Sequence, residues 1–155
     1  MKISNVQKGF TLVELLIVIA VVGILAAITT VSFVDYYQNQ IVQTAASELV
    51  STLNLAKSNA LSQVKPPACA ALDGYRVVIA NGATYNLEVV CSGTPTTVNS
   101  KSLSSPPDFT GMIFPSSFLF EVLTGNVVNS GSSTINISGY GKTQSITVSS
   151  TGVVR

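Results

Sequence analysis

The sequence predicts an α+β protein in which a long N-terminal helix, first transmembrane and then amphipathic, packs on an antiparallel β-sheet domain. Three observations lead to this prediction. Residues 10–34 contain one charged side chain, residues 35–65 carry apolar residues every three or four positions, and short alternating segments separated by turn residues follow residue 70. One long helix followed by many short strands is typical of this class. The predicted organisation is a leader at 1–9, an apolar helix at 10–34, its amphipathic continuation at 35–65 and an exported domain at 66–155.

The apolar helix at residues 10–34 is predicted to cross a membrane. Its 25 residues extend about 37 Å at about 1.5 Å per residue, against a hydrocarbon core of about 30 Å. Lys2 and Lys8 precede the segment, so we expect the N-terminus to face the cytoplasm and the remainder to be exported. The single charge is Glu14. An isolated carboxylate in such a segment costs free energy, which indicates that it has a function.

The helix is predicted to continue beyond the membrane as one rod of about 55 residues, because neither proline nor glycine occurs between residue 24 and Pro66-Pro67. Its apolar side chains fall on one helical face, which is expected to pack on the remaining chain rather than to form a groove for a partner. These side chains are Ile41, Val42, Ala45, Leu49, Leu53, Ala56 and Ala60.

The exported domain is predicted to be built from short strands. They are expected at residues 75–80, 84–91, 118–122, 127–128, 134–138 and 144–149, with a last short strand in the tail at 151–155. Asn81-Gly82 is a strong hairpin signal, and Tyr85, Leu87 and Val89 should share one face. Residues 92–110 are rich in Ser, Thr and Pro and are predicted to be a loop, whereas Asp73-Gly74 is predicted to be a turn rather than a calcium site. Whether the strands form one sheet or two is left open.

The two cysteines, Cys69 and Cys91, both follow the predicted anchor. A disulfide can persist on the exported side of a membrane, and two cysteines allow one intrachain pairing. We therefore favour a Cys69–Cys91 bridge over two free thiols. A bridge that closes about 21 residues would stabilise the domain by roughly 3 kcal/mol.

The residues that most catalytic and metal sites require are missing or scattered. There is no histidine, which removes the commonest general base and metal ligand. No dinucleotide fingerprint, P-loop or Cys-x-x-Cys motif occurs, so we expect no enzymatic activity, no cofactor and no metal. The formal net charge is +1 without a block of like charges, which makes nucleic acid an unlikely partner.

The segment Lys8-Gly9-Phe10-Thr11-Leu12-Val13-Glu14 and the apolar run after it resemble the class III signal of type IV pilins and pseudopilins. The resemblance implies that a prepilin peptidase cuts between Gly9 and Phe10 and that Phe10 becomes N-methylated. It also implies that the helix first anchors the chain in the bacterial inner membrane and later forms the core of a filament with other pilin or pseudopilin subunits. A plain membrane anchor that never assembles is the alternative.

The resemblance suggests a role for Glu14. After cleavage the Phe10 amine carries a charge in an apolar environment, and Glu14 of a neighbouring subunit can pair with it and fix the register of the assembly. The alternative is a Glu14 that is merely solvated among lipid headgroups.

Two further segments, residues 46–62 and 145–154, resemble pseudopilins of the GspH/FimT type. Lys57 stands where that family commonly has arginine, and Val31 stands where many type IV pilins have proline. The resemblance implies a structural subunit of a type IV pilus or of a type II secretion pseudopilus and favours a minor one. The alternative is a minor pilin that acts as a binding module in DNA uptake or adhesion. The sequence does not separate a pilus from a secretion pseudopilus, or a major subunit from a minor one.

Overall fold

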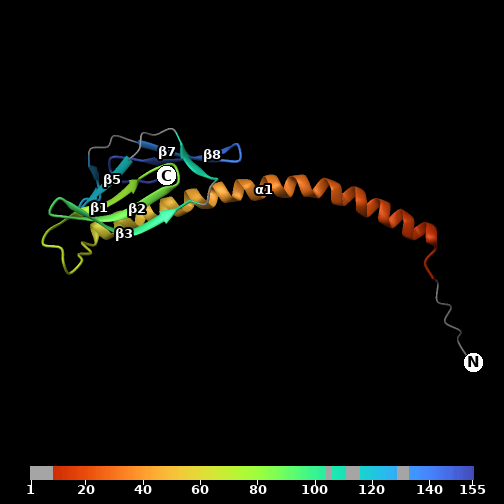
Figure 1. The fold of residues 1–155 in the computed structure, drawn as a ribbon, viewed down its shortest axis with the longest axis horizontal. Coiled ribbons are helices and arrows are strands. Elements are labelled where there is room, and N and C mark those ends of the chain that lie inside the picture. Colours follow the sequence, from red (N-terminus) through yellow and green to blue (C-terminus); the bar gives the residue numbers. More distant parts are fainter. Residues whose placement is uncertain (1–8, 104–105, 111–115, 129–132) are drawn as a thin grey trace, which may run out of the picture. The chain divides into compact units, whose positions relative to one another are not determined.

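The computed structural model describes residues 9–103, 106–110, 116–128 and 133–155; within the helix it describes the backbone of residues 27–32 but not their side chains. Lys2 and Lys8 of the predicted leader lie outside the described residues. The chain forms two compact units, Met1–Tyr37 and Gln38–Arg155. Helix α1, Leu12–Leu61, begins in the first unit and ends in the second (Figure 1). The predicted α+β class is confirmed.

Among the side chains that the structure describes, no helical stretch is both long and apolar enough to cross a membrane.

Helix α1 has 50 residues and ends slightly before the predicted stop at Pro66-Pro67. Its last turn closes with a Schellman motif, in which the Val64 amide donates to the Asn59 carbonyl (3.0 Å) and the Gln63 amide donates to the Ala60 carbonyl (3.3 Å). Gln63 adopts the left-handed conformation, with φ of 50°, at the position where glycine is usual. The hydrogen bonds satisfy carbonyl groups that would otherwise lack a partner at the helix end.

Two antiparallel sheets follow the helix. The first has the strand order β3-β2-β1-β5-β6 and the second has the order β4-β7-β8. The strands are β1 Leu72–Ile79, β2 Thr84–Cys91, β3 Thr94–Ser102, β4 Asp108–Thr110, β5 Ser116–Glu121, β6 Val127–Val128, β7 Ser133–Gly139 and β8 Lys142–Val148. The predicted tail strand is present as a single antiparallel bridge between Val154 and Val148. The sequence left open whether the strands form one sheet or two, and the structure has two.

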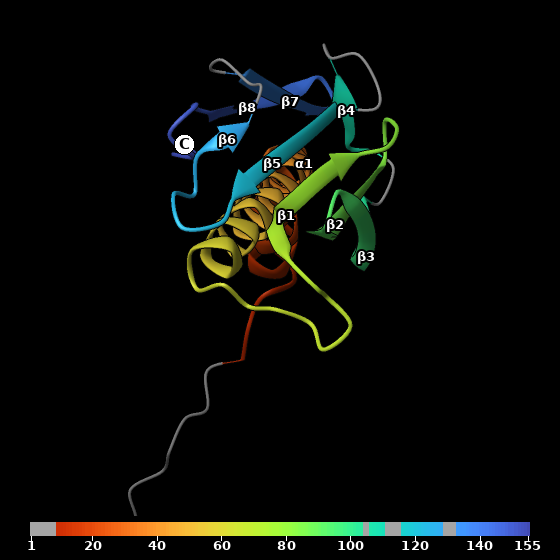
Figure 2. The same cartoon turned by 90° about the vertical axis from the view of Figure 1, so that its left-hand side faces the viewer.

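The core of the second unit lies between the sheets and the part of α1 that belongs to this unit. Figure 2, which looks along the helix, shows strands of both sheets arranged around it. The predicted apolar face of the helix is buried, except that Ile41 is only half-buried. Its buried members are Val42, Ala45, Leu49, Leu53, Ala56 and Ala60. The shared face predicted for Tyr85, Leu87 and Val89 is confirmed, because all three are buried against the helix side. The Tyr85 and Phe109 rings meet edge to face at 5.9 Å and join the two sheets.

The predicted loop at residues 92–110 is wrong. Strands β3 and β4 occupy most of it. Strand β3 is the edge of its sheet, and its nine residues are exposed except for the half-buried Lys101. Its sequence therefore carries no alternation of apolar and polar residues. It is held by backbone pairing with β2 along its length, which no local pattern reveals.

The predicted turn at Asp73-Gly74 is also wrong, because both residues lie in β1. The pairing register with β2 shifts between Leu72 and Gly74, and the Asp73 carboxylate accepts a hydrogen bond from the Gly93 amide at 2.6 Å. A Cβ at Gly74 would lie 2.2 Å from the Phe120 carbonyl oxygen. The glycine thus permits close strand packing at a bulge.

Two buried tyrosines in this core are expected to respond differently to replacement by phenylalanine. The Tyr75 hydroxyl donates to the Val64 carbonyl at 2.8 Å, whereas the buried Tyr85 hydroxyl makes no hydrogen bond of acceptable geometry with the described residues. Tyr75→Phe should cost about 1 kcal/mol, and Tyr85→Phe should leave stability unchanged or raise it by up to about 1 kcal/mol. Urea unfolding of both variants in detergent checks this, and a larger loss for Tyr85→Phe would contradict it.

The buried Tyr85 phenol also predicts that the free energy of unfolding falls at alkaline pH. Burial raises the pKa of the Tyr85 phenol, so the folded state holds this proton more tightly than the unfolded state does. The resulting contribution to stability is complete below pH of about 10 and is lost as the pH rises through the folded pKa. Tyr85→Phe should therefore flatten the alkaline fall in unfolding free energy.

Candidate functional site

The candidate site is the N-terminal end of α1, where the sequence predicts processing and assembly. Gly9 and Phe10 precede the helix, and Phe10 is 82% exposed. Thr11 is the N-cap residue, since its hydroxyl accepts a hydrogen bond from the Glu14 amide at 3.2 Å and its carbonyl accepts one from the Leu15 amide at 3.2 Å. The predicted cleavage position therefore lies in accessible chain immediately before the first turn.

Glu14 occupies the third position of the helix, in the arrangement Thr-x-x-Glu of a capping box. A carboxylate in the first turn also interacts favourably with the helix dipole. This local role was missed in the sequence interpretation, although the Thr11-Leu12-Val13-Glu14 pattern signals it. Glu14 consequently has two possible uses, helix capping within the chain and charge pairing between chains, and a test must separate them.

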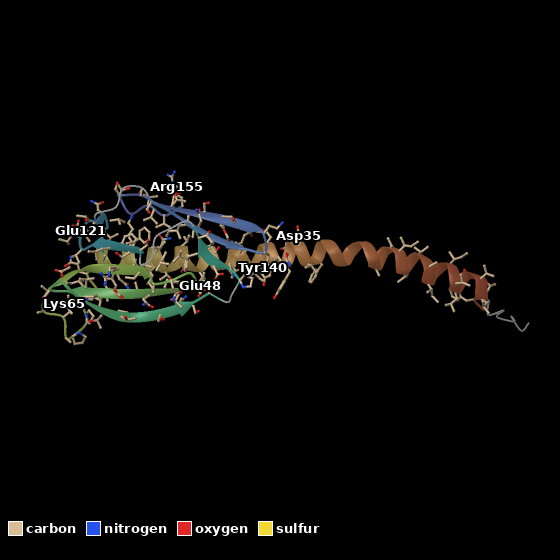
Figure 3. The ribbon with its side chains drawn as sticks, turned by 45° about the horizontal axis from the view of Figure 1, so that its top comes forward. Asp35, Glu48, Lys65, Glu121, Tyr140 and Arg155 are labelled. Carbon is tan, nitrogen blue, oxygen red and sulfur yellow. A yellow bond between two sulfur atoms is a disulfide. The ribbon has the colours of Figure 1, made fainter. Side chains whose placement is uncertain are left out.

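From residue 12 to residue 26 the surface of the helix is exposed and, apart from Glu14, apolar. Side chains drawn in Figure 3 stand out all around this part of the helix. Between residues 12 and 26, the large apolar side chains that are half or more exposed are Leu12, Val13, Leu15, Leu16, Ile17, Val18, Ile19, Val21, Val22, Ile24 and Leu25. A continuous apolar surface of this size is unstable in water and marks a contact with lipid or with other protein.

The predicted Cys69–Cys91 disulfide is confirmed, with the two Cα atoms 5.5 Å apart. It ties the segment after α1 to the end of β2. Replacing both cysteines by serine should lower the unfolding free energy by roughly 3 kcal/mol, because the unfolded chain gains freedom. Urea unfolding of the double variant in detergent, beside the parent protein with and without reductant, measures the loss; equal midpoints for all three samples would contradict the prediction.

Lys57 connects the second half of α1 to the C-terminal tail. Its ammonium group donates to the carbonyl oxygens of Gly152 (2.9 Å) and Thr151 (3.4 Å). Gly125 and Gly152 both have positive φ, and a side chain would be tightly packed at Gly125 and would clash at Gly152. A Cβ at Gly152 would lie 2.1 Å from the Gly125 carbonyl oxygen, and one at Gly125 would lie 3.1 Å from Lys57 Cε. Lys57 therefore has a structural role, at the position where the sequence resemblance leads one to expect arginine.

Two ion pairs join charged side chains of the second unit. Arg76 and Glu88 pair across β1 and β2 at 2.6 Å, and Lys101 of β3 pairs with Glu48 of α1 at 2.6 Å. The Glu48 hydrogen bond raises the pKa of Lys101. Within the residues that the structure describes, no group of three or more His, Cys, Asp or Glu side chains could hold a metal ion.

Comparison with known proteins agrees with the geometry of the N-terminal end. Residues 4–30 match the family model of the prokaryotic N-terminal methylation motif. The chain is 49% identical over 59 residues to a fimbrial protein of Pseudomonas aeruginosa and 49% identical over 47 residues to a type IV major alpha-pilin of Moraxella bovis. The N-terminal part of this chain is similar to the N-terminus of type IV pilins. A type IV major fimbrial protein of Dichelobacter nodosus is a further pilin relative, 48% identical over 48 residues.

The similarity to these pilins is confined to part of each chain. It covers 38% of this chain and 38% of the Pseudomonas protein, 30% of both chains for the Moraxella protein, and 31% of this chain and 28% of the Dichelobacter protein. No solved structure is significantly similar to this chain. The similarity to pilins is therefore shown for the N-terminal part of the chain, and the minor GspH/FimT subtype remains a prediction.

Proposed function

We propose that the protein is a structural subunit of a type IV pilus, cleaved between Gly9 and Phe10 by a prepilin peptidase and methylated at Phe10. The observation that carries this proposal is the methylation motif at residues 4–30, which overlaps the first part of α1, where the side chains of residues 12–26 are exposed and apolar apart from Glu14. The relatives are called fimbrial proteins and pilins, which favours a pilus over a secretion pseudopilus.

The proposed sequence of events follows from the physical chemistry of the first unit. Residues 10–34 hold the precursor in the inner membrane, with the exported domain on the far side, because 25 residues with a single charge suit a bilayer core. After cleavage, the same apolar surface is transferred from lipid to neighbouring helices. Contacts with neighbouring helices then replace contacts with lipid. The apolar surface is covered before and after assembly, so little additional apolar surface has to be buried.

Within the filament, the Phe10 amine and Glu14 of an adjacent copy are proposed to pair. Each charge would otherwise be buried alone, and a buried ion without a partner costs several kcal/mol. The Thr11 cap supports this use, because it starts the helix at Leu12 and thereby keeps Glu14 close to the new terminus.

Recovery of the protein in sheared surface filaments tests the proposal. In a host with its pilus machinery, the processed chain should be present in the sheared fraction and should disappear from it when the peptidase gene is deleted. A chain that stays with the cell membranes in both strains would overturn the assignment as a filament subunit. A chain that is sheared from both would overturn the dependence on processing.

A further inference from the structure

Aromatic side chains gather at the C-terminal end of the first unit. Phe33, Tyr36 and Tyr37 are 69%, 67% and 59% exposed, and apart from them this unit contains only one aromatic residue, Phe10. Their spacing of three and four residues places them on one side of α1. We call these three residues the aromatic band.

The aromatic band marks the point at which the chain changes from apolar to polar. The preceding segment has one charge in 25 residues, whereas Asp35, Gln38, Asn39 and Gln40 surround or follow the band. Rings with an apolar body and a polar tip are enriched at the level of lipid headgroups. An exposed cluster of two tyrosines and a phenylalanine at this boundary therefore has the chemistry of a membrane-interface anchor.

The distance from the band to Glu14 matches the thickness of a bilayer core. Glu14 and Tyr36 are 22 positions apart within one helix, which corresponds to about 33 Å at about 1.5 Å per residue. A hydrocarbon core measures about 30 Å. When the band lies at one interface, Glu14 reaches the other, where a carboxylate costs far less than at the bilayer centre.

We propose that the aromatic band anchors the precursor at the outer lipid interface and thereby holds Glu14 and the Gly9–Phe10 bond at the inner interface. Glu14 is then solvated while the chain resides in the membrane and loses water only on assembly. The cleavage position is presented at a fixed depth. This inference rests on the proposed function, since it assumes that residues 10–34 occupy a bilayer.

The chain contains no tryptophan, so single-tryptophan variants report depth without background. Full-length Tyr36→Trp, Ile24→Trp and Leu12→Trp are placed in phosphatidylethanolamine–phosphatidylglycerol vesicles. The lipids are brominated either near the headgroup or deep in the acyl chain. We expect the probes at positions 12 and 36 to be quenched mainly by the shallow bromines and the probe at 24 mainly by the deep ones. Deep quenching at position 36, or quenching there only by water-soluble acrylamide, would overturn the anchor.

A second set of variants tests whether the band controls the depth of the N-terminal end. Phe33→Ser/Tyr36→Ser/Tyr37→Ser is combined with Leu12→Trp, and the matched control is Asn39→Ser/Gln40→Ser/Thr44→Ser, three exposed positions further along the same helix. The band variant should lose the preference for shallow quenching at position 12, and the control should keep it. Unchanged quenching in the band variant would overturn the proposal.

Two further outcomes distinguish failure of the lipid-anchor role from failure of the proposed function and from contacts between copies of the chain. Failure of the parent chain to sediment with vesicles overturns the membrane step of the proposed function itself. Shielding of the position-36 probe that appears only at high protein-to-lipid ratio identifies the band as a contact between copies and overturns its role as a lipid anchor.

Discussion

Replacing Glu14 with alanine is expected to remove the protein from filaments while cleavage after Gly9 continues. The Phe10 amine would remain charged in an apolar filament core without its partner. Removing one member of a buried ion pair costs about 3–5 kcal/mol, so incorporation should fall about a hundredfold or more. Quantitative immunoblots of sheared filaments, from cells that also express the parent subunit, measure the ratio.

Two control variants distinguish charge pairing from helix capping. Glu14→Gln keeps a side chain that can complete a capping box but carries no charge, so it should fail like Glu14→Ala. Thr11→Ala removes the observed N-cap but keeps the carboxylate, and should cost only about 1 kcal/mol of helix stability. If Glu14→Gln is incorporated into filaments normally and Thr11→Ala is not, Glu14 acts as a helix cap rather than as a charge partner.

The second large effect is expected at Gly152, where alanine should destabilise the second unit by about 3 kcal/mol or more. Gly152 has φ of 69°, and its Cβ would lie 2.1 Å from the Gly125 carbonyl oxygen. The clash would be between two backbone segments, and moving the tail aside would disturb the hydrogen bonds that Lys57 donates to Thr151 and Gly152.

Gly141 provides the matched control. It has nearly the same φ, 72°, but no atom lies within 4 Å of the position of its Cβ. Gly141→Ala should therefore carry only the cost of the left-handed conformation, roughly 1–2 kcal/mol. Urea unfolding of the two variants in the same detergent gives both values. Equal losses would show that the contact between Gly125 and Gly152 is not a constraint.

The features of the fold that depend on local patterns were predictable from the sequence. The apolar face of α1 follows from spacing alone, and the hairpin after β1 follows from Asn81-Gly82, where the Asn81 carboxamide oxygen accepts from the Ala83 and Thr84 amides. The disulfide was favoured because export was predicted and because two cysteines allow one intrachain pairing, and the structure contains this bridge.

The features that were missed depend on contacts between distant segments. Strand β3 is polar and exposed, and only its pairing with β2 makes it a strand. Gly74 was assigned to a turn because Asp-Gly is a turn signal, yet the approach of the Phe120 backbone requires a glycine there. At the site, the predicted Gly9, Phe10 and Glu14 lie together at the helix start, whereas the Thr11 cap was overlooked although its pattern is local.

The central claim is that the N-terminus is processed as a pilin, and the intact mass of the protein from membranes of a host with its prepilin peptidase tests it most directly. We expect a chain that begins at Phe10 and carries one added methyl group, with the Cys69–Cys91 bridge intact. A full-length chain that still begins at Met1 would contradict processing, and with it the charge pair at Phe10 and Glu14.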